Sequence, residues 1–72
     1  MQRINTLKEC RTEQGLSQLE LYALSGVSPN TLVAIEKYYH LPRPKLRQAL
    51  ADALKVDVTV LFPDVTEGGN NE

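Results

Sequence analysis

The chain has 72 residues and a formal net charge of −1. A chain of this length forms a single domain, which buries only about 60% of the surface that its unfolded state exposes and has no room for a large cleft. Its single cysteine, Cys10, excludes an internal disulfide and a cysteine-rich zinc site, and no secretory signal or membrane-spanning apolar run is visible. We therefore expect a cytoplasmic protein.

The first predicted helix covers residues 4–14. Its residues on one side recur with helical spacing and are Ile4, Leu7, Cys10 and Arg11. Gly15 would end this helix as a C-terminal glycine. Cys10 occupies an apolar position, so core packing is favoured over redox sensing.

A second helix is predicted from Gln18 to Leu24. Ser17 with Glu20 three residues later forms a capping box, and Leu21 and Leu24 are expected to point inward. Gly26 would then supply a turn.

The third helix is predicted to start at Pro29, because Ser28 is a good N-cap and proline costs nothing at the first helical position. Val27 would fill the angle between the second and third helices. Leu32 and Ile35 face the core in this prediction. The opposite face is then free to enter a groove and carries Pro29, Asn30, Val33 and Lys37.

Residues 38–44 form a predicted connector, because Pro42 and Pro44 interrupt a helical ladder. A fourth amphipathic helix is predicted over residues 45–55, with Arg47 and Asp52 outside. Its inward positions would be Leu46, Leu50, Ala53 and Leu54. Residues 37–47 hold basic residues and no acid, which predicts a local positive surface beside the third helix, although a merely solvated face is the alternative. These residues are Lys37, His40, Arg43, Lys45 and Arg47.

Asp57 is expected to cap a last short helix over residues 58–62, with Leu61 and Phe62 closing the core. The alternation in residues 56–62 also allows a strand, donated to a second subunit. We expect one helix-turn-helix domain over residues 1–65. A disordered tail is expected over residues 66–72, which offer nothing to bury.

Residues 7–62 together resemble the Cro and phage-repressor type of helix-turn-helix domain, also called the xenobiotic-response-element family. The matching residues are Leu7, Arg11, Gly15, Leu16, Ser17, Gln18, Leu21, Gly26, Val27, Ser28, Thr31, Leu32, Ile35, Glu36, Pro42, Leu50, Ala51, Ala53, Leu54, Val56, Leu61 and Phe62. The resemblance implies an all-α, compact five-helix bundle of the lambda-repressor-like kind. It also implies binding to operator DNA as a dimer, with the third helix in the major groove.

Carried over to this sequence, the resemblance implies that Gln18 contacts a phosphate and that Arg11 pairs with Glu36. The resemblance also implies that four residues contact bases, namely Pro29, Asn30, Val33 and Ala34. Thr31 is added to this set because its hydroxyl can reach either a base or a phosphate. Three features depart from the family pattern. The third helix offers Pro29, Val33 and Ala34 where many relatives have glutamine, arginine or serine, so base readout is expected to be sparse. Tyr22 replaces the usual alanine, so its ring points outward or the helices are spread, and Tyr38 replaces the usual glycine after the third helix.

The chemistry of the residues adds to this assignment. Asn30 can form a bidentate pair with adenine, and the helix N-terminus at Ser28 can hold a phosphate. Further backbone contacts are expected from Lys37, Arg43 and Lys45. A dimer is expected to use the end of the domain, at Val58, Val60 and Phe62, where an exposed valine is a modest sign of an interface.

The leading hypothesis is a sequence-specific DNA-binding transcriptional regulator, a repressor that binds a palindromic operator as a homodimer. An alternative is a protein-interaction module on the same fold, such as the antitoxin of a toxin pair or a partner of another regulator. A small structural bundle is the third. Because no paired catalytic acids, metal cluster or Ser/His/Asp arrangement is visible, we expect neither an enzyme nor a cofactor.

Overall fold

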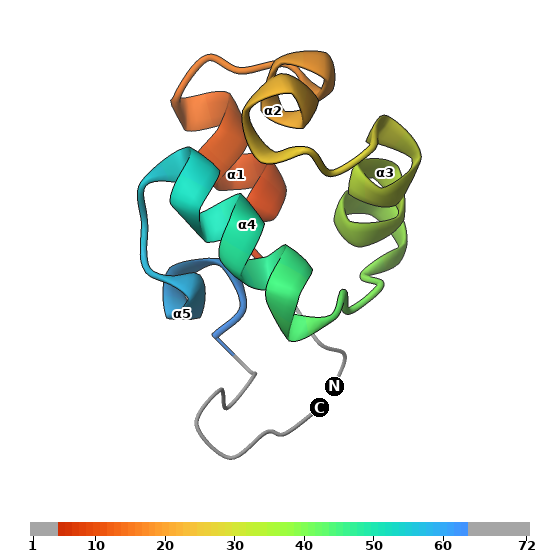
Figure 1. Ribbon diagram of the computed structural model, residues 1–72, viewed down its shortest axis with the longest axis vertical. Coiled ribbons are helices and arrows are strands. Elements are labelled where there is room, and N and C mark those ends of the chain that lie inside the picture. The colour runs from red at the N-terminus through yellow and green to blue at the C-terminus, as the bar shows by residue number, and fades with distance from the viewer. Residues whose placement is uncertain (1–4, 64–72) are drawn as a thin grey trace.

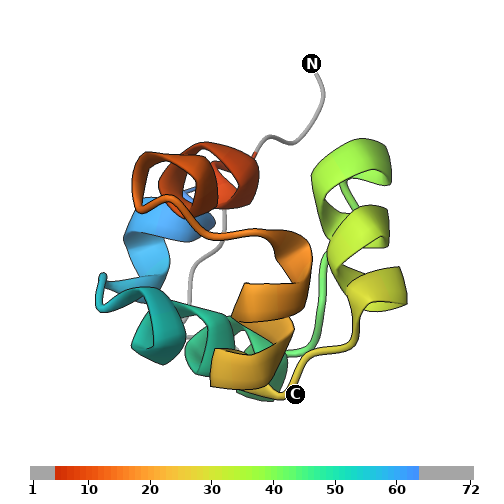
Figure 2. The same ribbon diagram turned by 90° about the horizontal axis from the view of Figure 1, so that it is seen from above.

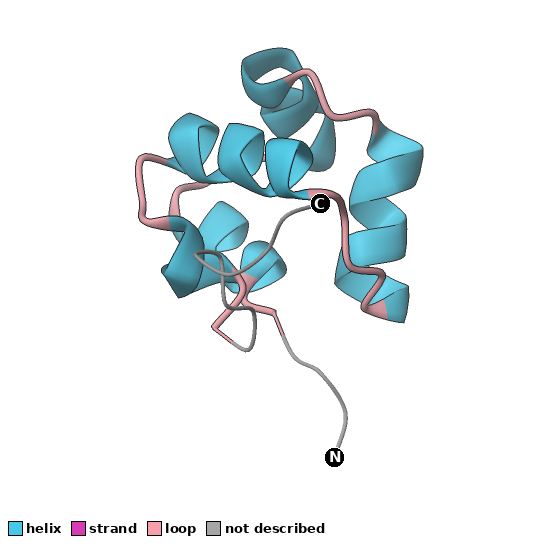
Figure 3. Ribbon diagram, turned by 60° about the horizontal axis from the view of Figure 1, so that its bottom comes forward, coloured by secondary structure: helices cyan, strands magenta, loops and turns pink. Residues whose placement is uncertain are grey.

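The computed structural model describes residues 5–63, which form five helices and no strand (Figures 1 and 3). The helices are α1 (Leu7–Glu13), α2 (Gln18–Ser25), α3 (Pro29–Tyr38), α4 (Pro44–Leu54) and α5 (Val58–Leu61). The all-α fold class is therefore confirmed. The alternative strand at the end of the domain is wrong, because Asp57 caps a helical turn there by accepting a hydrogen bond from the Thr59 N–H.

The helix ends follow from local capping. Ser17 Oγ accepts a hydrogen bond from the Glu20 N–H at 3.0 Å, and the Ser17 N–H donates to Glu20 Oε1 at 2.8 Å, which completes the predicted capping box. Gly26 ends α2 in the left-handed conformation, with φ of 80°. Ser28 then caps α3, and Pro29 takes its first position, as expected.

A single core lies between the helices. The buried apolar side chains come from every helix and from the α2–α3 turn, and are Leu7, Leu21, Val27, Leu32, Ile35, Leu50, Ala51, Leu54, Leu61 and Phe62. α4 contacts both α2 and α5, whereas α3 packs against α1 and α2 (Figure 2). α3 therefore lies at one side of the bundle, supported along one face only.

The start of α1 is fastened to two other helices. Asn5 Nδ2 donates to the Ile35 carbonyl at 3.1 Å, which ties the segment to α3. Thr6 donates to α5 twice, from its N–H to the Leu61 carbonyl and from its hydroxyl to the Val60 carbonyl. These hydrogen bonds hold α3 and α5 at fixed positions relative to α1.

Two predicted side-chain orientations are wrong. Leu24 is 58% exposed, because the less exposed stripe of α2 passes through Gln18, Leu21 and Ser25 and leaves Leu24 at its edge. Arg47 is only 3% exposed, and its guanidinium donates a hydrogen bond to the Pro42 carbonyl beneath the α3–α4 connector. An arginine can bury its long apolar stem in this way while its donors find a backbone acceptor.

The proline-rich connector is shorter than expected. Pro44 does not lie in it but takes the first position of α4, with Arg43 as the N-cap residue, because proline lacks only an N–H that the first helical turn would leave unpaired. The left-handed residue after α3 is Tyr39, with φ of 57°, while Tyr38 is the last helical residue. Tyr22 is half-exposed, which shows that its ring points outward.

The helix predicted from residue 4 begins at Leu7. Ile4 and the tail expected over residues 66–72 lie outside the described residues. No helix in the described part of the chain has the length and hydropathy needed to cross a membrane.

Candidate nucleic-acid interface

The outer face of α3 carries the predicted base-contacting residues. Asn30 is exposed, and its side chain makes no hydrogen bond within residues 5–63. The other four positions, Pro29, Thr31, Val33 and Ala34, are partly exposed. The Thr31 hydroxyl lies 3.1 Å from Ser28 Oγ, so it is shared with the helix cap. Asn30 is thus the side chain of this face whose full amide is available to a base.

The N-terminus of α3 is accessible at Ser28. Its side chain is exposed and accepts a hydrogen bond from the Thr31 N–H at 3.4 Å. Pro29 has no N–H, so the Asn30 N–H remains as a donor of the first turn, and the helix dipole gives this end partial positive charge. This arrangement can hold an anion such as a phosphate.

A network of polar side chains joins three helices behind this face. Arg11 Nε lies 2.8 Å from Glu36 Oε2, and Arg11 Nη2 lies 3.0 Å from Glu36 Oε1, so the predicted ion pair is present and bidentate. Arg11 also donates to the Leu16 carbonyl at 2.7 Å. The hydrogen bonds to Glu36 raise the pKa of Arg11 above its ordinary value, against the opposite effect of burial.

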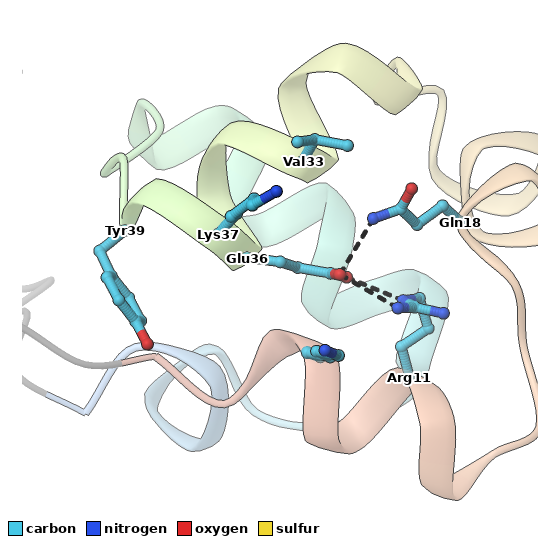
Figure 4. Close-up of a pocket in the computed structure, with 7 residues that line it drawn as sticks. Arg11, Gln18, Val33, Glu36, Lys37 and Tyr39 are labelled. Atoms are coloured by element: carbon cyan, nitrogen blue, oxygen red, sulfur yellow. Dashed lines mark hydrogen bonds and ion pairs between the residues drawn. The ribbon is translucent and has the colours of Figure 1, made fainter.

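Gln18 belongs to the same network. Its Nε2 donates to Glu36 Oε1 at 3.1 Å, as Figure 4 shows. One N–H of the amide is therefore committed to Glu36, and the second N–H is the one that can reach a phosphate. The network fixes the position of Gln18 relative to α3.

A groove of about 560 Å³ lies in front of the network, between α1 and α3 (Figure 4). We call it the α1–α3 groove. Its lining residues are Lys8, Arg11, Gln18, Val33, Glu36, Lys37 and Tyr39. The structure thus brings Gln18 and Lys37, both predicted to contact phosphates, to one groove that also borders Val33 of the base-contacting face.

Lys8 and Tyr39 were missed as site residues by sequence analysis. Lys8 precedes Arg11 by three residues, so both lie on one side of α1, and this spacing was a usable signal. No local pattern indicated that this side of α1 faces α3, and only the Arg11–Glu36 pair implied by the family resemblance pointed there. Tyr39 reaches the groove because its left-handed backbone turns the chain at the end of α3.

The basic residues within residues 37–47 differ in how far they are exposed. Lys37, His40, Arg43 and Lys45 are exposed, whereas Arg47 is buried. The Lys37 ammonium lies 5.9 Å from the centroid of the Tyr38 ring, close enough for a cation–π contact. The positive surface therefore rests on the three exposed cations Lys37, Arg43 and Lys45.

The three residues expected at a dimer interface differ in exposure. Phe62 is 3% exposed and belongs to the core, and Val58 is partly buried against it. Val60 is 46% exposed. Only Val60 of these three presents a largely accessible apolar side chain.

Comparison with known families agrees with this geometry. The family model described as Helix-turn-helix matches residues 7–61, which include all five helices. A search of curated proteins found no match. The family is one of DNA-binding regulators. The chain therefore belongs to the helix-turn-helix family of the Cro and phage-repressor type.

Proposed function

We propose that this protein is a sequence-specific transcriptional regulator, a repressor that binds a palindromic operator as a homodimer with α3 in the major groove. The observation that carries the proposal is the outer face of α3, where the unpaired amide of Asn30 lies on the same stripe as Lys37. A helix supported along one face by its own domain leaves the other face to enter a groove of DNA.

Base recognition rests mainly on Asn30. Its amide can donate to adenine N7 and accept from adenine N6, a pair worth about 1–3 kcal/mol of discrimination. The remaining side chains of this face are small or apolar and suit thymine methyl groups rather than bidentate hydrogen bonds. They are Pro29, Thr31, Val33 and Ala34. We therefore expect these side chains to favour an operator rich in A·T steps.

Phosphate contacts surround the base-reading face. Gln18 and Ser28 lie at the N-termini of α2 and α3, and each can contact a phosphate from a helix end. On the other flank, Lys37, Arg43 and Lys45 are exposed cations. Contacts of this kind fix the position of the protein on the duplex without reading its sequence.

Dimerisation is proposed at α5. Val60 provides an exposed apolar side chain, Val58 is partly buried against the core, and Phe62 belongs to the core. Two copies would place their α3 helices in successive major grooves, with half-sites about 34 Å apart, one turn of DNA.

In-vitro selection of duplex DNA, followed by footprinting, tests the function directly. We expect an enriched palindrome with A·T pairs opposite Asn30 and protection of two half-sites. Gel shifts with Asn30→Ala and Arg43→Ala should show relaxed specificity and uniformly weaker binding, respectively. Absence of enrichment, with both variants indistinguishable from the unaltered protein, would falsify the proposal.

A second candidate is a protein-interaction module, such as the antitoxin of a toxin pair or a partner of another regulator. It is supported by α2, whose apolar side chains Leu19, Tyr22 and Leu24 are exposed. Co-purification of a stoichiometric protein that blocks DNA binding would favour this function. A steep dependence of DNA affinity on salt, without such a partner, would favour the first.

A further inference from the structure

We propose that the α1–α3 groove seats a phosphate of the DNA backbone, held by Lys8 from α1, Lys37 from α3 and the hydroxyl of Tyr39. This inference rests on the proposed function and extends it beyond the helix-turn-helix itself. It adds Lys8 and Tyr39 as binding residues, one before the motif and one after it.

The charge of the groove favours an anion. Its lining holds three cations, Lys8, Arg11 and Lys37, and one carboxylate, Glu36. Both oxygens of that carboxylate are occupied by Arg11, and one also accepts from Gln18. The two lysines thus make the opening positive in a protein whose net charge is −1.

The polar donors of the groove suit a phosphate. Lys8 and Lys37 are exposed, so neither ammonium has been desolvated within the domain. Figure 4 shows Lys37 on the α3 side of the groove, Tyr39 at one end with its hydroxyl directed toward the α1 side, and Gln18 at the other end. A tyrosine hydroxyl is a neutral donor that phosphate oxygens accept from readily.

The position of the groove selects DNA as the source of the phosphate. Val33 and Lys37 line it from α3, and with Asn30 they form one stripe at spacings of three and four residues. A duplex in contact with Asn30 would therefore run past the groove opening. A free phosphate would not require this alignment.

The test measures the affinity for the selected duplex over a series of salt concentrations. Lys8→Gln should weaken binding about fivefold at low salt. It should also reduce the slope of log affinity against log salt by about 0.9, the value for one phosphate contact. Lys55→Gln is the matched control and should change neither quantity, since Lys55 is an exposed lysine that caps the C-terminus of α4. That end of α4 lies away from α3 (Figure 1).

Tyr39→Phe tests the contribution of the hydroxyl hydrogen bond apart from that of the lysine charges. It should weaken binding while leaving the salt slope unchanged, because it removes a hydrogen-bond donor and no cation. Thermal unfolding of each variant should match that of the unaltered protein, since both altered groups are exposed.

Three outcomes would overturn the inference. A Lys8→Gln slope equal to that of Lys55→Gln would remove Lys8 from the DNA contact while leaving the proposed function intact. Occupancy of the groove by inorganic phosphate in an NMR titration, without competition against the duplex, would assign it to a free phosphate. Failure of the unaltered protein to bind any selected duplex would instead reject the proposed function itself, and this inference with it.

Discussion

The Glu36 side chain joins α3 to both α1 and α2 through hydrogen bonds. Its carboxylate accepts hydrogen bonds from Arg11 of α1 and Gln18 of α2, and its side chain is only 5% exposed. A buried ion pair adds little net stability, but removal of one partner leaves the other charge buried without compensation. The role of Glu36 is therefore to fix α3 against the two preceding helices.

Glu36→Ala should lower the free energy of unfolding by about 3 kcal/mol, because the Arg11 guanidinium would lose its carboxylate. Urea denaturation measures this loss. Glu13→Ala is the control, since Glu13 is an exposed acid near the end of α1, and it should change stability by less than about 0.5 kcal/mol. Equal effects of the two substitutions would contradict the proposed role.

Substitution of Asn30 should reduce the sequence specificity of DNA binding without changing the stability of the fold. Asn30→Ala should leave the unfolding transition unchanged, since the side chain is exposed and forms no hydrogen bond in the part of the chain that the structure describes. Discrimination at one A·T pair should fall by about 1–3 kcal/mol. Competition binding with single-base operator variants checks this, and an equal loss at every position would contradict it.

At the scale of elements, two helices end in the left-handed conformation at residues other than glycine. These residues are Tyr39 after α3, with φ of 57°, and Lys55 after α4, with φ of 61°. Left-handed backbone costs an L-residue roughly 1–2 kcal/mol, whereas glycine adopts it freely. Each helix end therefore carries a conformational cost that a glycine at the same position would avoid.

Lys55→Gly should stabilise the protein by about 1 kcal/mol, because the exposed side chain contributes little and the left-handed strain disappears. The reverse change at α2, Gly26→Ala, should destabilise by about as much. A Cβ at Gly26 would meet no atom within 4 Å, so this cost would come from the backbone alone. Thermal unfolding measures both, and a destabilising Lys55→Gly would show that the lysine stem packs usefully.

The element most affected by tertiary packing is α4. The sequence pattern predicts its position, and Leu50 and Leu54 are buried as expected. The burial of Arg47 was not predicted, because hydrophobic periodicity assigns every arginine to the exposed side of a helix. Only the fold brings the Pro42 carbonyl within reach of its guanidinium.

At the scale of the whole molecule, α3 and α5 are linked through the start of α1. Asn5 bonds to the end of α3, and Thr6 bonds to α5. A contact between two copies at α5 would therefore be transmitted to α3 with little freedom of rotation. Fixed spacing of the two α3 helices is what recognition of a palindrome requires.

Val60→Glu should weaken binding to a full palindrome more than binding to a half-site, since a buried charge at the α5 contact disfavours the dimer. Sedimentation should show less dimer, with an unchanged unfolding transition because Val60 is 46% exposed. Leu24→Glu, at an exposed leucine of α2, is the control. Equal effects at the two sites would argue against dimerisation through α5.

The sequence by itself determined the five helices, the N-caps of α2, α3 and α5, and most of the core. These features depend on local signals, such as the Ser17–Glu20 capping box, the Ser28–Pro29 start of α3 and apolar residues at helical spacing. It also predicted the Arg11–Glu36 pair, through resemblance to the family rather than through any local pattern.

Only the tertiary structure decided which polar residues face one another. Lys8 and Tyr39 meet Lys37 at the α1–α3 groove, and Gln18 joins the Arg11–Glu36 pair, because α1, α2 and α3 pack together at that point. Arg47 is buried in α4, where its guanidinium donates to the Pro42 carbonyl of the α3–α4 connector, so it does not contribute to the positive surface. Helical periodicity specifies which side of a helix is buried, but the neighbour that each exposed side chain meets depends on contacts between segments distant in the chain.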